Sequence, residues 1–423
     1  MSEYNTNPIV KRIAIKANCV FETPALIGSG VSGNTDSDVL RDNNGNAFLP
    51  GSTIAGVLKS LSSDTATLFG ENDAISPLWV YDANLEDATI ITLDGVEIGR
   101  DNKVALESKK YDYEAVCAKF TLRLLLTIRE KDKGYEGLLA KLIGVINSGI
   151  VSFGAKTRRG FGRVSCEGVY SFSFDLCKGN ETELKKWIDF EWKNQDGFTK
   201  EEGEHSQSDY KKITALIRLD GSVMIRDTRN IYDDIEEGDA PDYKHLSVGG
   251  KPAILGTSWA GAFRSGLYRL LAQKYPENAK KYLDEVFGYV SEEECEPSKI
   301  IFGASFLKPV NKDTDGYLKI SRVKIDRFTG GAAAGALFSE TPWYGGETTL
   351  EVRYPKNRGD IRELIMLGLD AADKGFIAIG GETSVGRGFI SITKVRDEDG
   401  GVSICGAKQE LKAKIEKTGG ESA

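Results

Sequence analysis

Two glycine-rich loops contain the residue types best suited to binding a sugar-phosphate backbone. The segment 154–163 (GAKTRRGFGR) carries four cations and no acid. Glycine lets the backbone approach a ligand closely, and guanidinium groups make forked contacts with phosphate oxygens. One such loop alone is more typical of a tight turn with solvated cations, but 380–388 repeats its Gly-x-x-Thr-x-x-Gly-x-Gly spacing. The phosphate contacts expected from these loops are Lys156, Arg158, Arg159, Gly160, Arg163, Thr383 and Arg387.

A long loop at 28–42, rich in glycine and hydroxyl residues, contains Asp36, Asp38 and Asp42. Carboxylates could hold a hard divalent cation or position a ribose 2′-hydroxyl, but Asp is also a common turn residue. The second half of the chain has an acidic loop at 233–242, in which Asp242 aligns within one residue of Asp36. On composition alone the turn interpretation is favoured.

Two expected helices begin with glycine followed by hydroxyl residues, and their N-termini could present N–H groups to a phosphate. A cation lies further along each helix. The alternative is a capped helix whose cation is solvated. The residues concerned are Ser52, Thr53 and Lys59 in the first half and Thr257, Ser258 and Arg264 in the second.

These motifs recur in one order, which predicts two homologous domains. Residues 51–59 align with 256–264, Phe69-Gly70 with Phe287-Gly288, and 154–162 with 380–388, at offsets of 205, 218 and 226. The growing offsets indicate loop insertions in the second copy. We expect a first domain at 1–194, an acidic linker at 195–209, a second domain at 210–408 and a charged tail at 409–423.

Each copy shows the element order β-α-β-β-α-β, the ferredoxin-like arrangement. The first helix of each copy is expected to be capped by Ser or Thr. The first copy has expected strands at 9–20, after Phe69-Gly70, at 120–128 and at 150–153, and helices at 53–61 and 135–147. The second has strands at 212–219, after Phe287-Gly288, at 348–352 and at 376–379, and helices at 258–271 and 361–372.

The charge balance argues against an indiscriminate nucleic-acid binder, because the net charge is −8 and the pI is about 5.2. However, the segments 195–209, 233–242 and 291–297 carry −4, −6 and −4, so the rest of the chain carries +6. Local charge decides phosphate binding. Six cysteines without a Cys-x-x-Cys pair and only two histidines give little support to a zinc site, and free thiols are expected. With no signal-peptide pattern, a reducing cytoplasm is the expected location.

In this order the motifs resemble those of the RAMP (repeat-associated mysterious protein) superfamily of CRISPR effectors, and most closely the backbone subunit of type III complexes. The first half matches through Asp36-Ser-x-Val-x-Arg-Asp, Phe48-Leu-Pro-Gly-Ser-Thr-x-x-Gly-x-Leu-Lys59, Leu68-Phe69-Gly70 and the glycine-rich loop. In the second half, Ile325-Asp326-Arg327-x-Thr329-Gly330, Ala336-Leu337-Phe338 and Glu340 look like the thumb of that subunit.

The resemblance implies an α+β protein of two tandem modified ferredoxin-like (RRM-type) domains, each with a thumb insertion. The first thumb is expected near 103–116, where Tyr111 and Tyr113 could replace an apolar wedge or be plain strand residues. In the family, subunits assemble along a guide CRISPR RNA with other RAMP subunits and a large polymerase-like subunit, and the thumbs interrupt the guide–target duplex.

In that family an aspartate of the first loop cleaves the single-stranded target RNA with a divalent metal, here expected to be Mg²⁺. Asp36 matches this catalytic and metal-binding residue, and Asp242 is the candidate in the second half. Arg327 and Phe338 are further RNA contacts that the resemblance implies, Phe338 by packing on a base.

Three alternatives remain open. The chain could be a non-catalytic subunit that only binds guide RNA, with aspartates that shape turns. It could be a guide-RNA processing ribonuclease, although such enzymes commonly use histidine and neither His205 nor His245 is placed to serve both copies. A metabolic α+β enzyme would need a pocket chemistry that the sequence does not display.

Overall fold

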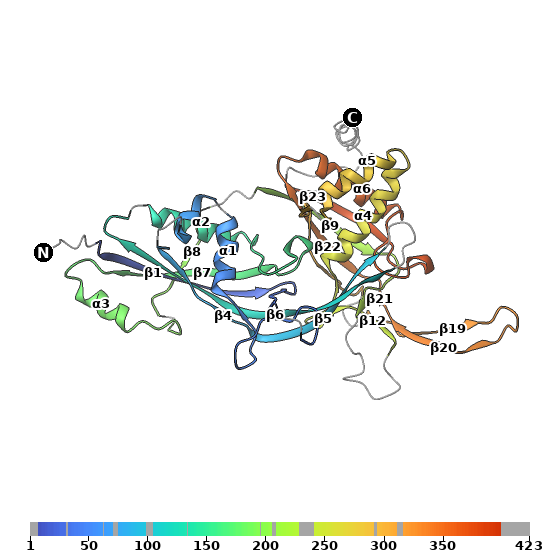
Figure 1. Ribbon diagram of the computed structural model, residues 1–423, viewed down its shortest axis with the longest axis horizontal. Coiled ribbons are helices and arrows are strands. Elements are labelled where there is room, and N and C mark those ends of the chain that lie inside the picture. The colour runs from blue at the N-terminus through green and yellow to red at the C-terminus, as the bar shows by residue number, and fades with distance from the viewer. Residues whose placement is uncertain are drawn as a thin grey trace. The chain divides into compact units, whose positions relative to one another are not determined.

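The computed structural model describes residues 7–30, 33–61, 63–70, 75–98, 105–132, 134–194, 196–204, 209–227, 241–291, 294–310 and 316–398, without the side chains of 96–98, 105–110 and 334. It divides into two compact units (Figure 1). Unit 1 comprises Met1–Ile91, Glu114–Ala155 and Gly162–Ser208, and unit 2 comprises Thr92–Tyr113, Lys156–Phe161 and Asp209–Ala423. Two short segments of the first sequence repeat therefore pack with the second.

Unit 1 is built on an antiparallel sheet in the order β3-β6-β1-β7-β8, with β5 also paired to β6. The elements are β1 (Ile9–Phe21), β2 (Phe48–Leu49), α1 (Gly51–Leu61), η1 (Ser63–Phe69), β3 (Leu78–Val80), β4 (Ala83–Asn84), β5 (Glu86–Ile98), β6 (Ala105–Arg129), α2 (Tyr135–Asn147), β7 (Val164–Asp175), α3 (Glu181–Ile188) and β8 (Thr199–Glu201). We refer to the long hairpin β5–β6, which covers most of the region where the first thumb is expected, as the first thumb; residues 103–104 of that region lie outside the described residues.

Alternation along the strands of unit 1 gives the sheet two buried faces, because successive side chains point to opposite sides. Ile13 and Ile15 of β1 join the main core beneath α1 and α2, which contribute Ile54 and Leu142 (Figure 1). On the other face, Ala14 packs in an aromatic cluster that β7 and the segment after it supply. That cluster includes Phe172, Phe174, Trp187, Phe190, Trp192 and Phe198.

Unit 2 repeats the central strand order, since β17-β22-β9-β23 corresponds position by position to β3-β6-β1-β7. Its elements include β9 (Tyr210–Leu219), β10 (Ser222–Val223), β11 (Arg226–Asp227), β12 (Tyr243–His245), β13 (Ser247–Val248), β14 (Lys251–Ile254), α4 (Gly256–Ala272), α5 (Pro276–Phe287), β15 (Tyr289–Val290), β16 (Cys295–Glu296) and β17 (Ile301–Phe302). They continue with β18 (Ser305–Phe306), β19 (Ile320–Ile325), β20 (Ala332–Thr341), β21 (Trp343–Tyr344), β22 (Glu347–Pro355), α6 (Gly359–Asp373), η3 (Thr383–Val385) and β23 (Ile390–Asp397). We refer to the hairpin β19–β20, which contains the residues expected in the second thumb, as the second thumb.

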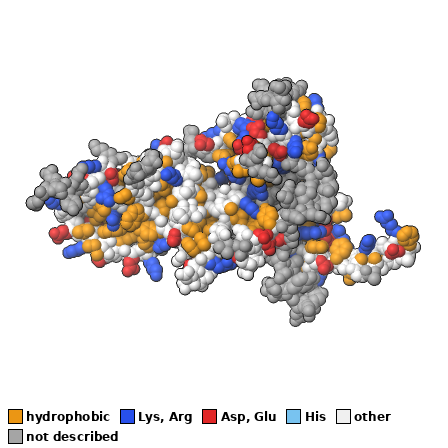
Figure 2. Space-filling view, viewed as in Figure 1, with side chains coloured by type: hydrophobic (Ala, Val, Ile, Leu, Met, Phe, Trp, Pro, Cys, Tyr) orange, Lys and Arg blue, Asp and Glu red, His pale blue; other side chains and the backbone are white. Residues whose placement is uncertain are grey.

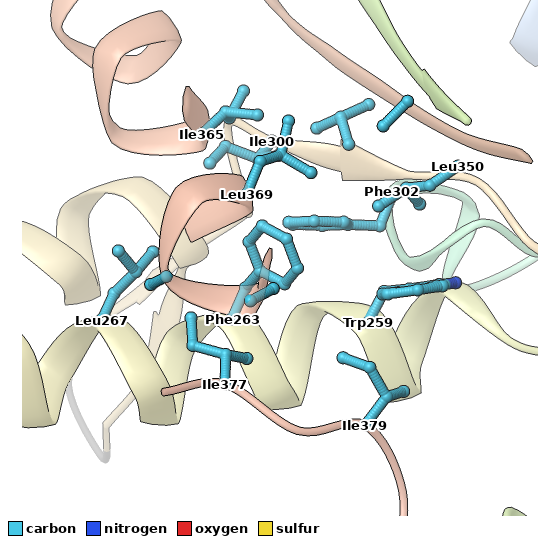
Figure 3. Packing of buried hydrophobic residues seen from close by; sticks show 14 of the residues in the cluster. Trp259, Phe263, Leu267, Ile300, Phe302, Leu350, Ile365, Leu369, Ile377 and Ile379 are labelled. Carbon is cyan, nitrogen blue, oxygen red and sulfur yellow. The ribbon is translucent and has the colours of Figure 1, made fainter. Parts of the chain in front are cut away.

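The core of unit 2 lies between this sheet and the helices α4, α5 and α6 (Figures 1 and 3). Trp259 and Phe263 of α4 point toward Phe302 of β17 and Leu369 of α6, and all four are almost fully buried. Burying large side chains of this kind provides much of the stability that holds the helices on the sheet. The loops around the sheet are thereby fixed in place.

The predicted order of elements is found in both units, but the position of each last strand was wrong. Residues 150–153 and 376–379 are not strands, and β7 and β23, which follow the glycine-rich loops, pair with β1 and β9 instead. The expected acidic linker also contains a strand, β8, which joins the sheet of unit 1.

Two local expectations also need correction. Leu255 occupies the N-cap of α4 and makes no side-chain capping bond, so Thr257 and Ser258 are helical residues and not caps. Cys19 and Cys166, which face each other across β1 and β7, form a disulfide, whereas Cys117, Cys177 and Cys295 form none, as expected. None of the helices in the described parts of the chain is long and apolar enough to cross a bilayer.

Candidate nucleic-acid interface

The first aspartate-rich loop contains three aspartates, of which Asp38 and Asp42 accept hydrogen bonds that shape turns. Asp38 accepts hydrogen bonds from the hydroxyl and N–H of Thr35 and from the N–H of Asn34, and the pKa of Asp38 is lowered, chiefly by the Thr35 hydroxyl. Asp42 accepts from the N–H groups of Asn44 and Asn46, and the Asn46 bond contributes most to its lowered pKa. The Asp36 side chain is exposed to solvent. The turn interpretation therefore holds for Asp38 and Asp42, and the exposed carboxylate of Asp36 is accessible to a ligand.

The loop around Asp36 is attached to the base of the first thumb through Glu114 of β6. The N–H of Glu114 donates to the carbonyl of Ser37 at 2.9 Å. The Glu114 carboxylate accepts the N–H of Val39 at 2.9 Å and forms an ion pair with Arg41. Asp36 is thus held beside the strand that leaves the thumb.

Asp242 lies at the matching place in unit 2. Its Oδ2 accepts the N–H of Ser339 at 2.7 Å, and the strand β12 that follows it pairs in parallel with β20, placing Tyr243 opposite Glu340. Glu340 is 226 residues beyond Glu114, the same offset that separates the glycine-rich loops. Asp242 is exposed. Most of its loop, 228–240, lies outside the described residues.

The second thumb presents an apolar and basic tip. Asp326 accepts the N–H groups of Phe328 and Thr329 and the Thr329 hydroxyl, which closes the turn between β19 and β20 and lowers the pKa of Asp326. This turn exposes Arg327 and leaves 98% of Phe328 accessible to solvent. Figure 2 shows hydrophobic and basic side chains along the hairpin; Val323, Ile325 and Leu337 are among its exposed apolar residues. Phe338 is half-buried.

The glycine-rich loop of unit 2 does not present Arg387 to RNA, which corrects the expectation from sequence. Arg387 is 2% exposed and pairs with Glu340 of the second thumb and with Glu382 of its own loop. Arg322 of β19 joins the same network. Burial raises the pKa of Glu340. Of the predicted contacts in this loop, the partly exposed Thr383 remains, at the start of η3.

In the glycine-rich loop of the first repeat, the cations are unequally available. The Lys156 ammonium lies 3.6 Å from the ring centre of Tyr113 and donates to the Tyr111 hydroxyl at 3.1 Å, and burial lowers the pKa of Lys156. Tyr113 is buried, so it is not an exposed wedge. Arg158 donates to the Tyr210 hydroxyl and to the carbonyl of Ser298.

Three further predicted residues of this segment have different surroundings. Arg163 forms an ion pair with Glu22 at 2.9 Å. Arg159 is exposed, and Gly160 adopts a left-handed backbone with φ 83°. Gly160 packs so closely against the backbone of Phe302 that only glycine fits, since a Cβ at this position would lie 2.4 Å from the Phe302 carbonyl oxygen. Arg159 is therefore the most accessible of the predicted cations of this loop.

The beginnings of the two helices are largely occupied by protein groups. The N–H of Gly51 in α1 donates to Asp82 at 2.6 Å, although Ser52 is exposed and Thr53 is partly exposed. In α4, a Cβ on Gly256 would lie 2.2 Å from the Phe302 carbonyl oxygen, so the backbone is closely packed there and Thr257 and Ser258 are only partly exposed.

The two helix cations have partners within the protein. Lys59 donates to the carbonyl of Gly70 at 3.0 Å, and Arg264 pairs with Asp284 of α5. The expectation that they bind phosphate is not supported by these contacts.

Sequence reasoning missed Glu114 and the role of Arg41. Arg41 belongs to the motif that begins with Asp36, but a motif does not name its partner, which lies 73 residues away in the chain. The available signal was the repeat offset, because Glu114 and Glu340 are separated by the same 226 residues as the glycine-rich loops. Together, these contacts place exposed carboxylates and thumb strands side by side in both repeats.

Comparison with known proteins gives one result that bears on this arrangement. The family model of the RAMP superfamily matches residues 18–165 and 242–391, which together make up more than half of the chain and correspond to the two sequence repeats. No curated protein matches the chain significantly. The chain belongs to the RAMP superfamily, a CRISPR-associated family of RNA-binding proteins.

Proposed function

We propose that this chain is a tandem backbone subunit of a type III CRISPR effector that binds guide RNA and cleaves complementary target RNA. The observation that carries the proposal is the repeated placement of a loop aspartate at the base of a thumb strand, with Asp36 beside Glu114 and Asp242 beside Ser339. The β-α-β-β-α-β order and the matching strand orders support a modified ferredoxin-like fold for each domain.

The proposed reaction is a transesterification, in which the 2′-hydroxyl of the neighbouring ribose attacks the phosphate at the cut. The Asp36 carboxylate, which is exposed, accepts the proton of the 2′-hydroxyl at the cut. The 2′-oxygen forms a bond to phosphorus as the bond from phosphorus to the 5′-oxygen breaks, and the 5′-oxygen takes a proton from water. The products are a 2′,3′-cyclic phosphate and a 5′-hydroxyl.

Asp36 fits a divalent metal that is bound together with RNA. Among the described residues, no three His, Cys, Asp or Glu side chains form a group that could hold a metal. Mg²⁺ is commonly bound by one or two carboxylates, waters and substrate phosphates, which is the donor set that Asp36 and an RNA backbone supply. When bound, the metal stabilises charge on the phosphoryl oxygens.

The second thumb suits the proposed interruption of a duplex. Phe328 is almost fully exposed at its tip, beside Arg327, so an apolar ring and a cation are presented together. An aromatic ring can stack on a base and a guanidinium can contact the adjacent phosphate. The partners would be guide CRISPR RNA, single-stranded target RNA, other RAMP subunits and a large polymerase-like subunit, in the cytoplasm.

The test is target cleavage by the assembled complex with Mg²⁺. Asp36→Ala should abolish one cut and leave target binding unchanged, and chelation of Mg²⁺ should have the same effect on that cut. Glu136→Gln serves as a control, because Glu136 lies on α2, is exposed and pairs only with Lys11 of β1 among the residues that the structure describes, away from the Asp36 loop. Undiminished cleavage at every position by Asp36→Ala would contradict the proposal.

For the second domain, a role in RNA binding without cleavage is the alternative. It is favoured by the hydrogen bond that occupies Oδ2 of Asp242. Asp242→Ala in the same assay separates the two roles, because loss of a second cut means that both domains cleave.

A further inference from the structure

Glu114 contacts the Asp36 loop more extensively than its position on a strand requires. It lies in β6, on the part of the first thumb strand that belongs to unit 1, and it is 8% exposed. A buried carboxylate is costly unless it is paired and hydrogen-bonded. The partners of Glu114 therefore indicate what this carboxylate does.

All of these partners lie in the five residues after Asp36. Both carboxylate oxygens accept from Nη2 of Arg41, at 2.9 and 3.0 Å, and Oε2 also accepts the N–H of Val39 at 2.9 Å. Nη1 of Arg41 donates to the carbonyl of Val39 at 3.1 Å, which closes a ring of interactions among the three residues. The N–H of Glu114 donates a hydrogen bond to the carbonyl of Ser37, the residue next to Asp36.

We propose that Glu114, with Arg41, is a positioning residue that fixes the Asp36 carboxylate for target cleavage. The inference rests on the proposed function and deepens it. Its physical basis is that Asp36 is exposed on a loop whose turn bonds, through Asp38, lie within residues 33–38. The backbone of the loop also pairs with Ser29 and Ile27, and Glu114 adds a side-chain connection from this loop to a strand of the sheet of unit 1.

The second repeat shows that this arrangement does not follow from the fold alone. The carboxylate of Glu340, at the same offset as the glycine-rich loops, forms ion pairs with Arg387 and Arg322. There, Asp242 itself bonds to the thumb strand through Ser339. The Glu114 interactions should therefore matter for the Asp36-dependent cut and for no other.

The experiment measures single-turnover cleavage by the assembled complex at saturating target, and target affinity separately. Glu114→Ala should slow the Asp36-dependent cut about 10- to 100-fold, because a displacement near 1 Å can cost about 100-fold in rate. Target affinity should stay within about threefold. Glu114→Gln keeps an acceptor for Val39 but loses the charge opposite Arg41, so it should recover part of the rate.

A double-mutant cycle and hydrogen exchange distinguish positioning from general destabilisation. Arg41→Ala should slow the same cut, and Arg41→Ala with Glu114→Ala should be no slower than the slower single variant, because both act through one contact. The amide of Val39 should exchange faster in Glu114→Ala, while amides of β1 and β7 should keep their protection. Glu136→Gln should match the wild type in every measurement.

The outcomes separate this inference from the proposed function. If Asp36→Ala does not abolish the cut, the proposed function fails. If Asp36→Ala abolishes the cut but Glu114→Ala cleaves within about twofold of the wild-type rate, only the positioning role is overturned. Should Glu114→Ala not assemble, wild-type rates for both Glu114→Gln and Arg41→Ala would overturn it as well.

Discussion

The stability of unit 2 should depend on the protonation of His245, and the dependence can be isolated with one substitution. His245 in β12 is fully buried, and its Nδ1 accepts the N–H of Ile225 at 3.1 Å. Burial lowers the pKa of His245 from 6.5 to about 4, and smaller raising effects come from the backbone of Ala253 and from Asp227. His245→Asn keeps a side-chain acceptor for Ile225 and removes the titrating ring.

The sign and size of the effect follow from proton linkage. Because the folded protein binds this proton less readily than the unfolded chain, the stabilisation is complete above pH 6.5 and is lost as the pH falls toward 4. Each pH unit in this range corresponds to about 1.4 kcal/mol. Between pH 7 and pH 5 the wild type should therefore lose about 2 kcal/mol more than His245→Asn, roughly a 30-fold change in the opening equilibrium.

Hydrogen exchange at the amide of Ile225 is the direct assay, because this N–H is bonded to the His245 ring. Protection is measured at pH 7 and pH 5 in both chains and corrected for the intrinsic exchange rate at each pH. Carboxylates that titrate in this range are common to both chains, so their contribution cancels. If the difference in protection between the two chains changed by less than about 0.5 kcal/mol, the effect assigned to His245 would be refuted.

Two further predictions concern the glycine-rich loop of unit 2. In urea unfolding, Gly388→Ala should destabilise unit 2 by about 2 kcal/mol more than Gly386→Ala. Both glycines have positive φ, so both substitutions strain the backbone. At Gly388, however, the new Cβ would also lie 2.0 Å from the carbonyl oxygen of Ile379, whereas at Gly386 it would meet open space. Equal losses would contradict this. Arg387→Met should lower the stability of unit 2 by about 3 kcal/mol, because it removes one partner of the buried Glu340 carboxylate. The loss is at the low end for a broken buried ion pair because Arg322 still pairs with Glu340, and adding Glu340→Leu should restore most of it. Hydrogen-exchange protection of the β20 amides measures the change, and full stability of the single variant would argue against a coupled pair.

Much of the fold could be predicted from the sequence because its strongest signals are periodic. The helices at 135–147 and 361–372 were expected from amphipathic spacing, and they form as α2 and α6. The misplaced strands have a different cause. Val151, Phe153, Ile377 and Ile379 are indeed buried, but a short apolar run indicates burial and not strand pairing.

The candidate site was less predictable, because the state of a charged side chain depends on partners that are distant in sequence. From sequence, Arg387 is predicted to be a solvent-accessible cation of its loop. In the structure it is buried and pairs with Glu340, which lies 47 residues earlier in the chain. Arg158 is likewise engaged by Ser298, 140 residues away. Counting cations in a loop thus measures how much charge it contains and not how much of it a ligand can reach. Asp36 and Arg327 are exposed, in agreement with what a ligand-binding role requires, and their roles stay predictions.

The two glycine-rich loops share a backbone shape but not a chemistry. Lys156 and Glu382 occupy the same loop position and both adopt positive φ, near 56° and 58°. Lys156 contacts tyrosines of the first thumb, whereas Glu382 forms ion pairs with arginines. Since the duplicated halves diverged, these loops have become non-interchangeable parts: a graft of 154–163 into the second half would place Phe161 where Arg387 now neutralises Glu340. Any chimera that exchanges the halves must therefore carry each loop together with its own thumb.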